Sequence, residues 1–205
     1  MSEPIRLTEA IPRARPPKPE EVQLRFSKNA VLELEALKPH YPDLKSLILP
    51  ALWIAQREYG WLPPEAIAEV ALRLKRSYAE VEGVATFYTM YDTEHKPGRH
   101  KIEVCTCLTC QVCGAYRLAE YLKAKLGVEF GGTTPDGEFT LEEVECLDAC
   151  DRAPVLQVGD QYHGPVDEAF VDRMLEKLRS EPESTALRLA DEVVGAHFSS
   201  SERPT

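Results

Sequence analysis

The sequence lacks a hydrophobic run long enough to cross a bilayer or to form a signal peptide. Its longest apolar stretch is 47–55, whereas a membrane-spanning helix needs about 20 apolar residues. The first residues carry Glu3 and Glu9 and have no apolar segment of signal-peptide length. We therefore predict a soluble, cytoplasmic protein without membrane insertion, in a compartment that keeps thiols reduced.

Positive charge is also scarce. The 205 residues include 24 Lys and Arg against 34 Asp and Glu, a formal net charge of −10, and the basic residues are scattered. Nucleic acid and anionic membrane surfaces repel such a chain, so neither is expected as a partner. A Gly-rich loop following a strand is missing as well, so the chain shows no nucleotide-binding fingerprint of its own.

Cysteine is absent before position 105 and after position 150. The six cysteines are Cys105, Cys107, Cys110, Cys113, Cys146 and Cys150. The five histidines are dispersed, which leaves thiolates as the only clustered metal ligands. Four converging thiolates suit either tetrahedral zinc or an iron–sulfur cluster, and a reducing compartment argues against disulfides.

The N-terminal half predicts a small helical bundle. Residues 1–26 contain five prolines and suit an extended arm without a core of its own. Residues 27–95 then show four amphipathic segments with capping signals. The expected helices are 28–37, 43–60 with a kink or late start at Pro50, 64–74 and 78–91.

The C-terminal half predicts an α+β domain over 96–179. A strand should end at the first cysteine and a helix should cover 115–126. A turn at 134–137, a strand over 138–146, a hairpin around Gly159 and a last helix capped by Asp167 follow. The tail, 180–205, is polar, with a short helix expected near 185–194.

Spacing alone leaves three ligand sets close to one another. Zinc could take Cys107 and Cys110 with Cys146 and Cys150. A plant-type ferredoxin would use Cys105, Cys110 and Cys113 plus one distant cysteine. The third set pairs Cys105 and Cys110 with Cys146 and Cys150. The local pattern favours it, because Cys113 falls where the chain enters a helix and the turn-prone residues after Cys105 argue against a continued strand that would align Cys107 with Cys105.

Two motifs carry a resemblance to a known family. VC-x4-C-x3-G and VECL-x-AC-x2-APV-x-QV, together with 59–71, 81–91 and 134–141, resemble the thioredoxin-like [2Fe-2S] subunit of the NADH-dehydrogenase module of respiratory complex I. The resemblance covers about 28–179. It implies a thioredoxin-like domain with one [2Fe-2S] cluster bound by Cys105, Cys110, Cys146 and Cys150. It gives Cys107 and Cys113 no ligand role, so both are expected as small, partly buried side chains beside the site.

The resemblance also implies a function and partners. The chain would be an electron-transfer subunit of NADH:quinone oxidoreductase, placed in the peripheral arm of that membrane-bound complex, on its cytoplasmic side in bacteria. Its cluster would exchange single electrons with the FMN of a larger flavoprotein subunit that also binds NADH, and the helical half would supply much of the docking surface. The isolated chain would not oxidise NADH.

Alternatives remain at this stage. The same subunit type occurs in NAD-reducing hydrogenases and NAD-dependent formate dehydrogenases, and a zinc-stapled interaction module is a third possibility. One residue departs from the resemblance: Asp148 stands where the family usually has Gly. If that position needs a positive φ, Asp tolerates it better than most residues, and its carboxylate would lie next to the cluster.

Overall fold

The computed structural model describes residues 17–18 and 22–180. The chain divides into two compact units, Met1–Lys96 and Pro97–Thr205, and each is described by itself. None of the helices over 22–180 combines the length and apolarity that a bilayer span requires. The helix predicted near 185–194 and most of the predicted arm lie outside the described residues.

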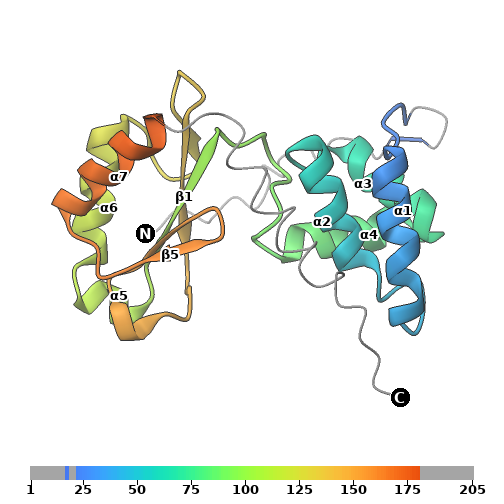
Figure 1. The fold of residues 1–205 in the computed structure, drawn as a ribbon, viewed down its shortest axis with the longest axis horizontal. Coiled ribbons are helices and arrows are strands. Elements are labelled where there is room, and N and C mark those ends of the chain that lie inside the picture. The colour runs from blue at the N-terminus through green and yellow to red at the C-terminus, as the bar shows by residue number, and fades with distance from the viewer. Residues whose placement is uncertain (1–16, 19–21, 181–205) are drawn as a thin grey trace, which may run out of the picture. The chain divides into compact units, whose positions relative to one another are not determined.

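Over residues 22–96, the first unit is a bundle of four α-helices, drawn from blue to green in Figure 1. They are α1 (Lys28–Leu37), α2 (Ile48–Tyr59), α3 (Pro64–Leu74) and α4 (Tyr78–Phe87), with a 3-10 turn, η1 (Lys38–His40), after α1. The predicted caps are confirmed: the Ser27 and Ser77 hydroxyls accept from the Ala30 and Glu80 amides, and Gly60 ends α2 with φ 79°.

Two helix boundaries differ from the sequence prediction. Helix α2 has the late start that Pro50 suggested, at Ile48 and not at residue 43. Helix α4 ends at Phe87, not at 91. Tyr88 already has an extended backbone, and beyond it the Gln56 side chain donates to the Met90 carbonyl at 3.0 Å and accepts from the Asp92 amide at 2.8 Å. These bonds hold the chain after α4 in a turn against α2.

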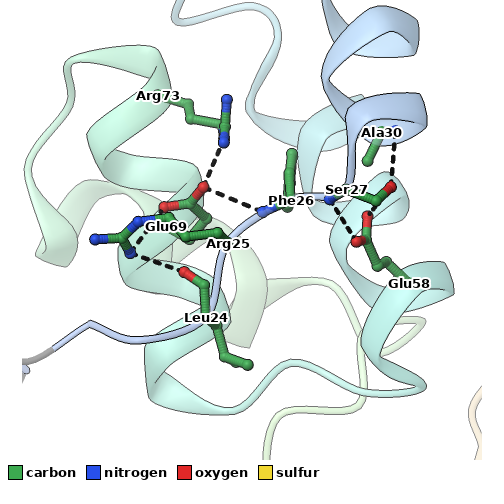
Figure 2. Close-up of polar contacts among 8 residues, drawn as sticks. All are labelled: Leu24, Arg25, Phe26, Ser27, Ala30, Glu58, Glu69 and Arg73. Carbon is green, nitrogen blue, oxygen red and sulfur yellow. Dashed lines mark hydrogen bonds and ion pairs between the residues drawn. The ribbon is translucent and has the colours of Figure 1, made fainter.

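A buried carboxylate ties the residues before α1 to the bundle (Figure 2). The Glu69 side chain on α3 is only 3% exposed. It accepts from Arg73 Nε at 2.7 Å, from Arg25 at 3.3 Å and from the Phe26 amide at 3.3 Å. The Phe26 ring joins the core of the bundle, and the Arg73 guanidinium lies over it, 5.1 Å from its centroid. Residues 22–27 are thus anchored to the bundle, although they form no helix.

The second unit is a mixed sheet of five strands with helices (Figure 1). Its strands are β1 (His100–Cys105), β2 (Gly132–Thr133), β3 (Phe139–Val144), β4 (Leu156–Val158) and β5 (Gln161–His163). The helices are α5 (Leu108–Val112), α6 (Ala115–Leu126), α7 (Glu168–Ser180) and the 3-10 turn η2 (Cys150–Arg152). The sheet order is β2-β3-β1-β4-β5, and only β1 and β3 are parallel.

The core of this unit lies between one face of the sheet and helices α6 and α7, which lie side by side in Figure 1. Alternate strand residues such as Ile102, Leu141 and Leu156 point into this core and are fully buried. The other face is polar and includes an ion pair between Lys101 and Glu103. The α+β class is therefore confirmed, and the parallel β1–β3 pair at its centre positions the cysteines.

Candidate metal centre

The two cysteine-bearing loops meet because β1 and β3 run parallel. Parallel neighbours end at the same edge of a sheet, and the register pairs Cys105 with Val144, the last residue of each strand. Just beyond the pair, the Thr106 amide donates to the Val144 carbonyl at 2.9 Å. The loop after β1 carries Cys107 and Cys110, and the loop after β3 carries Cys146 and Cys150, so these loops are neighbours.

The first loop buries two of its thiols. Cys105 is the last residue of β1, and its amide donates to the Val155 carbonyl at 3.1 Å. Cys110 lies in α5, and both cysteines pack with Ala115 and Val155 in a small apolar cluster of their own. Cys105 is 2% exposed and Cys110 is 1% exposed.

Cys107 joins these two thiols. The sulfur atoms of Cys105, Cys107 and Cys110 all lie within 4.8 Å of one another. The Cys110 amide N–H donates to the Cys107 sulfur and lowers the pKa of that thiol. Burial acts in the opposite direction on its neighbour and raises the pKa of the Cys110 thiol. The group therefore combines the partly exposed sulfur of Cys107, whose thiol has a lowered pKa, with the two buried sulfurs of Cys105 and Cys110.

The second loop presents its thiols near the surface. Cys146 and Cys150 are both exposed, and neither belongs to the three-sulfur group. The Asp148 amide donates to the Cys146 sulfur at 3.3 Å. Desolvation, and then the Cys107 sulfur, raise the pKa of the Cys150 thiol. The structure thus brings Cys105 and Cys110 together in an apolar cluster and sets the loop with the other predicted pair beside it.

This donor set fits a cluster held by thiolates. All six cysteines are free, and the three grouped ligand atoms are sulfurs, without a histidine or a carboxylate among them. Soft thiolates beside an apolar cluster suit iron–sulfur clusters or zinc and disfavour hard cations such as magnesium and calcium.

The predictions for the two remaining cysteines have different outcomes. Cys107 is partly buried beside the site, as expected. Cys113, the last residue before Gly114, is exposed, and the prediction of partial burial is wrong for it. Cys113 is the residue that ends α5, and Gly114 after it, with φ 98°, redirects the chain into α6. The prediction gave Cys107 only a place beside the site, whereas its sulfur belongs to the same group as those of Cys105 and Cys110. The C-x2-C spacing between Cys107 and Cys110 could have indicated this from the sequence.

Two carboxylates lie on the second loop. Asp148 adopts φ 53°, so the backbone does take the left-handed conformation that the Gly-to-Asp departure suggested, and its side chain is exposed. Asp151 is exposed as well and forms an ion pair with Arg152 at 3.6 Å. Asp148 therefore carries the less compensated charge of the two.

Comparison with known proteins gives matches over most of the chain. The family described as "Thioredoxin-like [2Fe-2S] ferredoxin" matches residues 34–179. An NADH-quinone oxidoreductase subunit of Rhizobium meliloti (strain 1021) is 46% identical over 158 residues, which cover 77% of this chain and 94% of that protein. An NADH-quinone oxidoreductase subunit of Rickettsia conorii (strain ATCC VR-613 / Malish 7) is 40% identical over 156 residues, covering 75% and 93%.

The fold also matches a solved structure. A chain of the NAD+-reducing [NiFe]-hydrogenase in the air-oxidized state superposes with a TM-score of 0.59 at 23% identity. The match covers 68% of this chain and 24% of the hydrogenase chain. At that identity the likeness concerns the fold: the arrangement of helices followed by a mixed sheet recurs as one part of a longer protein.

Proposed function

Because the chain belongs to the family of thioredoxin-like [2Fe-2S] ferredoxins, we propose that it is the [2Fe-2S] electron-transfer subunit of an NADH-quinone oxidoreductase, with Cys105, Cys110, Cys146 and Cys150 as the ligands. The observation that carries this function is the group of free thiols where the parallel strands β1 and β3 end. Two cysteines of the proposed set belong to that group, and the other two lie on the neighbouring loop.

The protein's own residues hold two of the proposed ligands, Cys105 and Cys110, in place. The β1 ladder and the bond from the Cys105 amide to Val155 hold that cysteine in place. Helix α5 carries Cys110 into the apolar cluster, where water is excluded. When bound, a [2Fe-2S] cluster supplies reversible one-electron transfer. The exposed second loop would then leave a route for the electron between the site and a partner.

The electron donor must lie on another subunit. NADH gives up two electrons as hydride, and a flavin is the usual group that splits the pair. The chain has no Gly-rich nucleotide motif, so FMN and NADH are assigned to a larger flavoprotein subunit. We propose accordingly that the chain lies in the arm of the complex outside the bilayer.

Exposed apolar side chains support a docking role. Beside the cysteines, Leu108 and Val112 of α5 are 76% and 81% exposed. In the helical unit, Phe87 at the end of α4 is 77% exposed, and its ring contacts that of Tyr88 at a centroid distance of 5.0 Å. Neighbouring apolar side chains that are exposed together suit a surface that a partner covers, whereas single exposed ones are common on any protein. We assign both surfaces to the flavoprotein partner.

The sequence relatives favour the quinone-reducing complex over a hydrogenase. Relatives at 46% and 40% identity are named as NADH-quinone oxidoreductase subunits, whereas the hydrogenase likeness, at 23%, concerns the fold alone. Purification of the chain from its native cells, with identification of the subunits that accompany it, distinguishes the two. Quinone-reductase subunits support this assignment, and a hydrogenase or formate dehydrogenase catalytic subunit contradicts it.

The ligand set is tested by replacing single cysteines with alanine. Cys105→Ala, Cys110→Ala, Cys146→Ala and Cys150→Ala should each abolish or badly degrade the [2Fe-2S] EPR signal and visible absorption, because each variant lacks one thiolate. Cys107→Ala and Cys113→Ala are the controls and should keep most of the signal. Iron and sulfide analysis of each purified chain provides an independent measure of how much cluster it binds.

Two other patterns would contradict the proposed set. Loss of the signal in Cys113→Ala with survival in Cys150→Ala would indicate the plant-type arrangement. A colourless chain that binds stoichiometric zinc would instead support the zinc-stapled module, because zinc thiolate does not absorb visible light.

A further inference from the structure

The proposed ligand set leaves Cys107 unused, although its sulfur lies among the buried thiols. The Cys107 sulfur is within 4.8 Å of the sulfurs of both Cys105 and Cys110. It is the partly exposed member of this group, and the other two are buried. A molecule in solution can therefore reach Cys107, and Cys107 can reach the two thiols behind it.

Local geometry favours Cys110 as the partner of Cys107. The Gln111 amide donates to the Cys107 carbonyl at 2.9 Å, so the chain makes a helical turn from Cys107 onward. In such a turn residues three apart lie on the same face. Cys105 is instead held at the end of β1 by strand pairing with Val144 and by its bond to Val155. Two cysteines separated by two residues also have the spacing of known redox dithiols.

We propose that Cys107 and Cys110 form a dithiol–disulfide pair in the chain that has not yet bound its cluster, and that the pair exchanges with small disulfides of the glutathione type. The Cys107 thiolate attacks one sulfur of the small disulfide, which forms a mixed disulfide and releases one thiolate. The Cys110 thiolate then attacks the Cys107 sulfur, closes the protein disulfide and expels the second thiolate. The pair loses two electrons, the small disulfide gains them, and the two cysteine protons end on the two released thiols.

This exchange would control cluster binding. Cys110 is one of the four proposed ligands, and this step of the inference rests on the proposed function. A sulfur held in a disulfide bond is no longer a thiolate and cannot bind iron. The oxidised chain would therefore accept a cluster only after reduction, and a bound cluster would in turn protect Cys110 from oxidation.

The pair is tested on the full-length, cluster-free chain under argon. The reduced chain is equilibrated with mixtures of reduced and oxidised glutathione, its free thiols are alkylated, and the products are mapped by mass spectrometry. We expect a linkage between Cys107 and Cys110 that grows with the proportion of oxidised glutathione and is lost in Cys107→Ser. Cys113→Ser is the matched control and should keep the linkage, because Cys113 also stands at C-x2-C spacing from Cys110. Free thiols throughout, or a linkage of Cys105 to Cys107 or of Cys110 to Cys113, would overturn the proposal.

Cluster assembly with ferrous iron and sulfide tests the control step. The oxidised chain should bind at least about tenfold less cluster than the reduced chain, and dithiothreitol should restore binding. Oxidised-glutathione treatment of Cys107→Ser should leave its cluster binding unchanged. Equal loading of the oxidised and reduced chains would refute the control of assembly. If the reduced chain takes no cluster while the linkage still forms, the proposed function fails and the dithiol pair stands.

Discussion

Asp148 combines an unusual backbone conformation with an exposed charge at the candidate centre. Its φ of 53° lies in the left-handed region, and its amide donates to the sulfur of Cys146, a proposed ligand. Reduction adds a negative charge to a thiolate-bound centre that is already anionic, so a nearby carboxylate disfavours the added electron.

Removing this charge while keeping the shape should raise the midpoint potential. In water, two unit charges 4 Å apart interact by an energy that corresponds to about 40 mV for one electron. Because Asp148 is exposed, we expect Asp148→Asn to raise the potential by roughly 10–40 mV at low salt, and by less at high salt. A redox titration followed by EPR measures the shift. Asn tolerates the left-handed backbone nearly as well as Asp.

Asp151→Asn provides the matched comparison. Asp151 already pairs with Arg152 at 3.6 Å, so its removal should shift the potential in the same direction by a smaller amount. An unchanged potential in Asp148→Asn at low salt would mean that Asp148 only forms the turn.

Glu69 is the residue on which the anchoring of the N-terminal segment depends (Figure 2). Its carboxylate is 3% exposed and has two arginine partners and one amide donor. Glu69→Ala would leave the Phe26 amide and the partly buried Arg73 without an acceptor, which should lower the free energy of unfolding by about 2–4 kcal/mol. Urea unfolding followed by circular dichroism measures this loss.

Arg25→Ala is the control for Glu69. The Arg25 side chain is 53% exposed, and an exposed ion pair contributes only about 0–1 kcal/mol. Equal losses in the two variants would show that the ion pair with Arg25, and not the burial of Glu69, holds the segment. Neither variant should alter the [2Fe-2S] EPR signal, because both residues belong to the helical unit.

At the scale of elements, the turn η2 depends on a glycine from the β5 end of the hairpin. A Cβ at Gly164 would lie 2.3 Å from the Arg152 carbonyl oxygen and 2.9 Å from Arg152 Cγ. Since η2 also carries Cys150, Gly164→Ala should displace this proposed ligand. We expect destabilisation by about 1–3 kcal/mol together with faster loss of iron to a chelator.

Gly159→Ala in the same hairpin is the control that separates the effect of backbone strain from the effect of moving η2. Gly159 has φ 56° but no atom within 4 Å of its ideal Cβ, so alanine there should cost about 1–2 kcal/mol of backbone strain without moving η2. Thermal unfolding and the rate of iron loss are measured for both variants. Equally fast iron loss in the two would refute a specific role for Gly164.

Local signals made most of these elements predictable from the sequence. Ser27, Gly60 and Asp167 mark helix ends through their own caps, and each acts as expected. The hairpin at Gly159 was likewise predicted from a local signal, the turn residues between its two strands. Strand β2 was missed because its two residues are defined only by pairing with β3. Helix α5 was missed because five residues, most of them exposed, show no helical period.

At the scale of the whole molecule, the sequence alone could not show that the two cysteine-bearing loops lie side by side. The resemblance selected the proposed ligands, but their placement depends on the parallel pairing of β1 with β3, a contact between residues about forty positions apart. The sulfur of Cys107 enters the three-sulfur group locally, through the helical turn that starts at Cys107. Long-range strand register is not readable from local pattern, and it decides that the loop with Cys146 and Cys150 lies beside the loop with Cys107 and Cys110.

The division of labour between subunits gives the last prediction. The purified chain with its cluster should be reduced by dithionite but not by NADH, because the sequence has no nucleotide-binding motif and a one-electron centre does not accept a hydride without a flavin. Anaerobic mixing with NADH, followed by EPR and by the absorbance of NADH, should show no reaction above background. Addition of the flavoprotein subunit with its FMN should allow NADH to reduce the cluster. A Cys150→Ala chain, mixed with the same flavoprotein, controls for electrons that remain on the flavin. Saturable binding of NADH to the chain alone, or its reduction by NADH without the flavoprotein, would contradict the assignment of both groups to the partner.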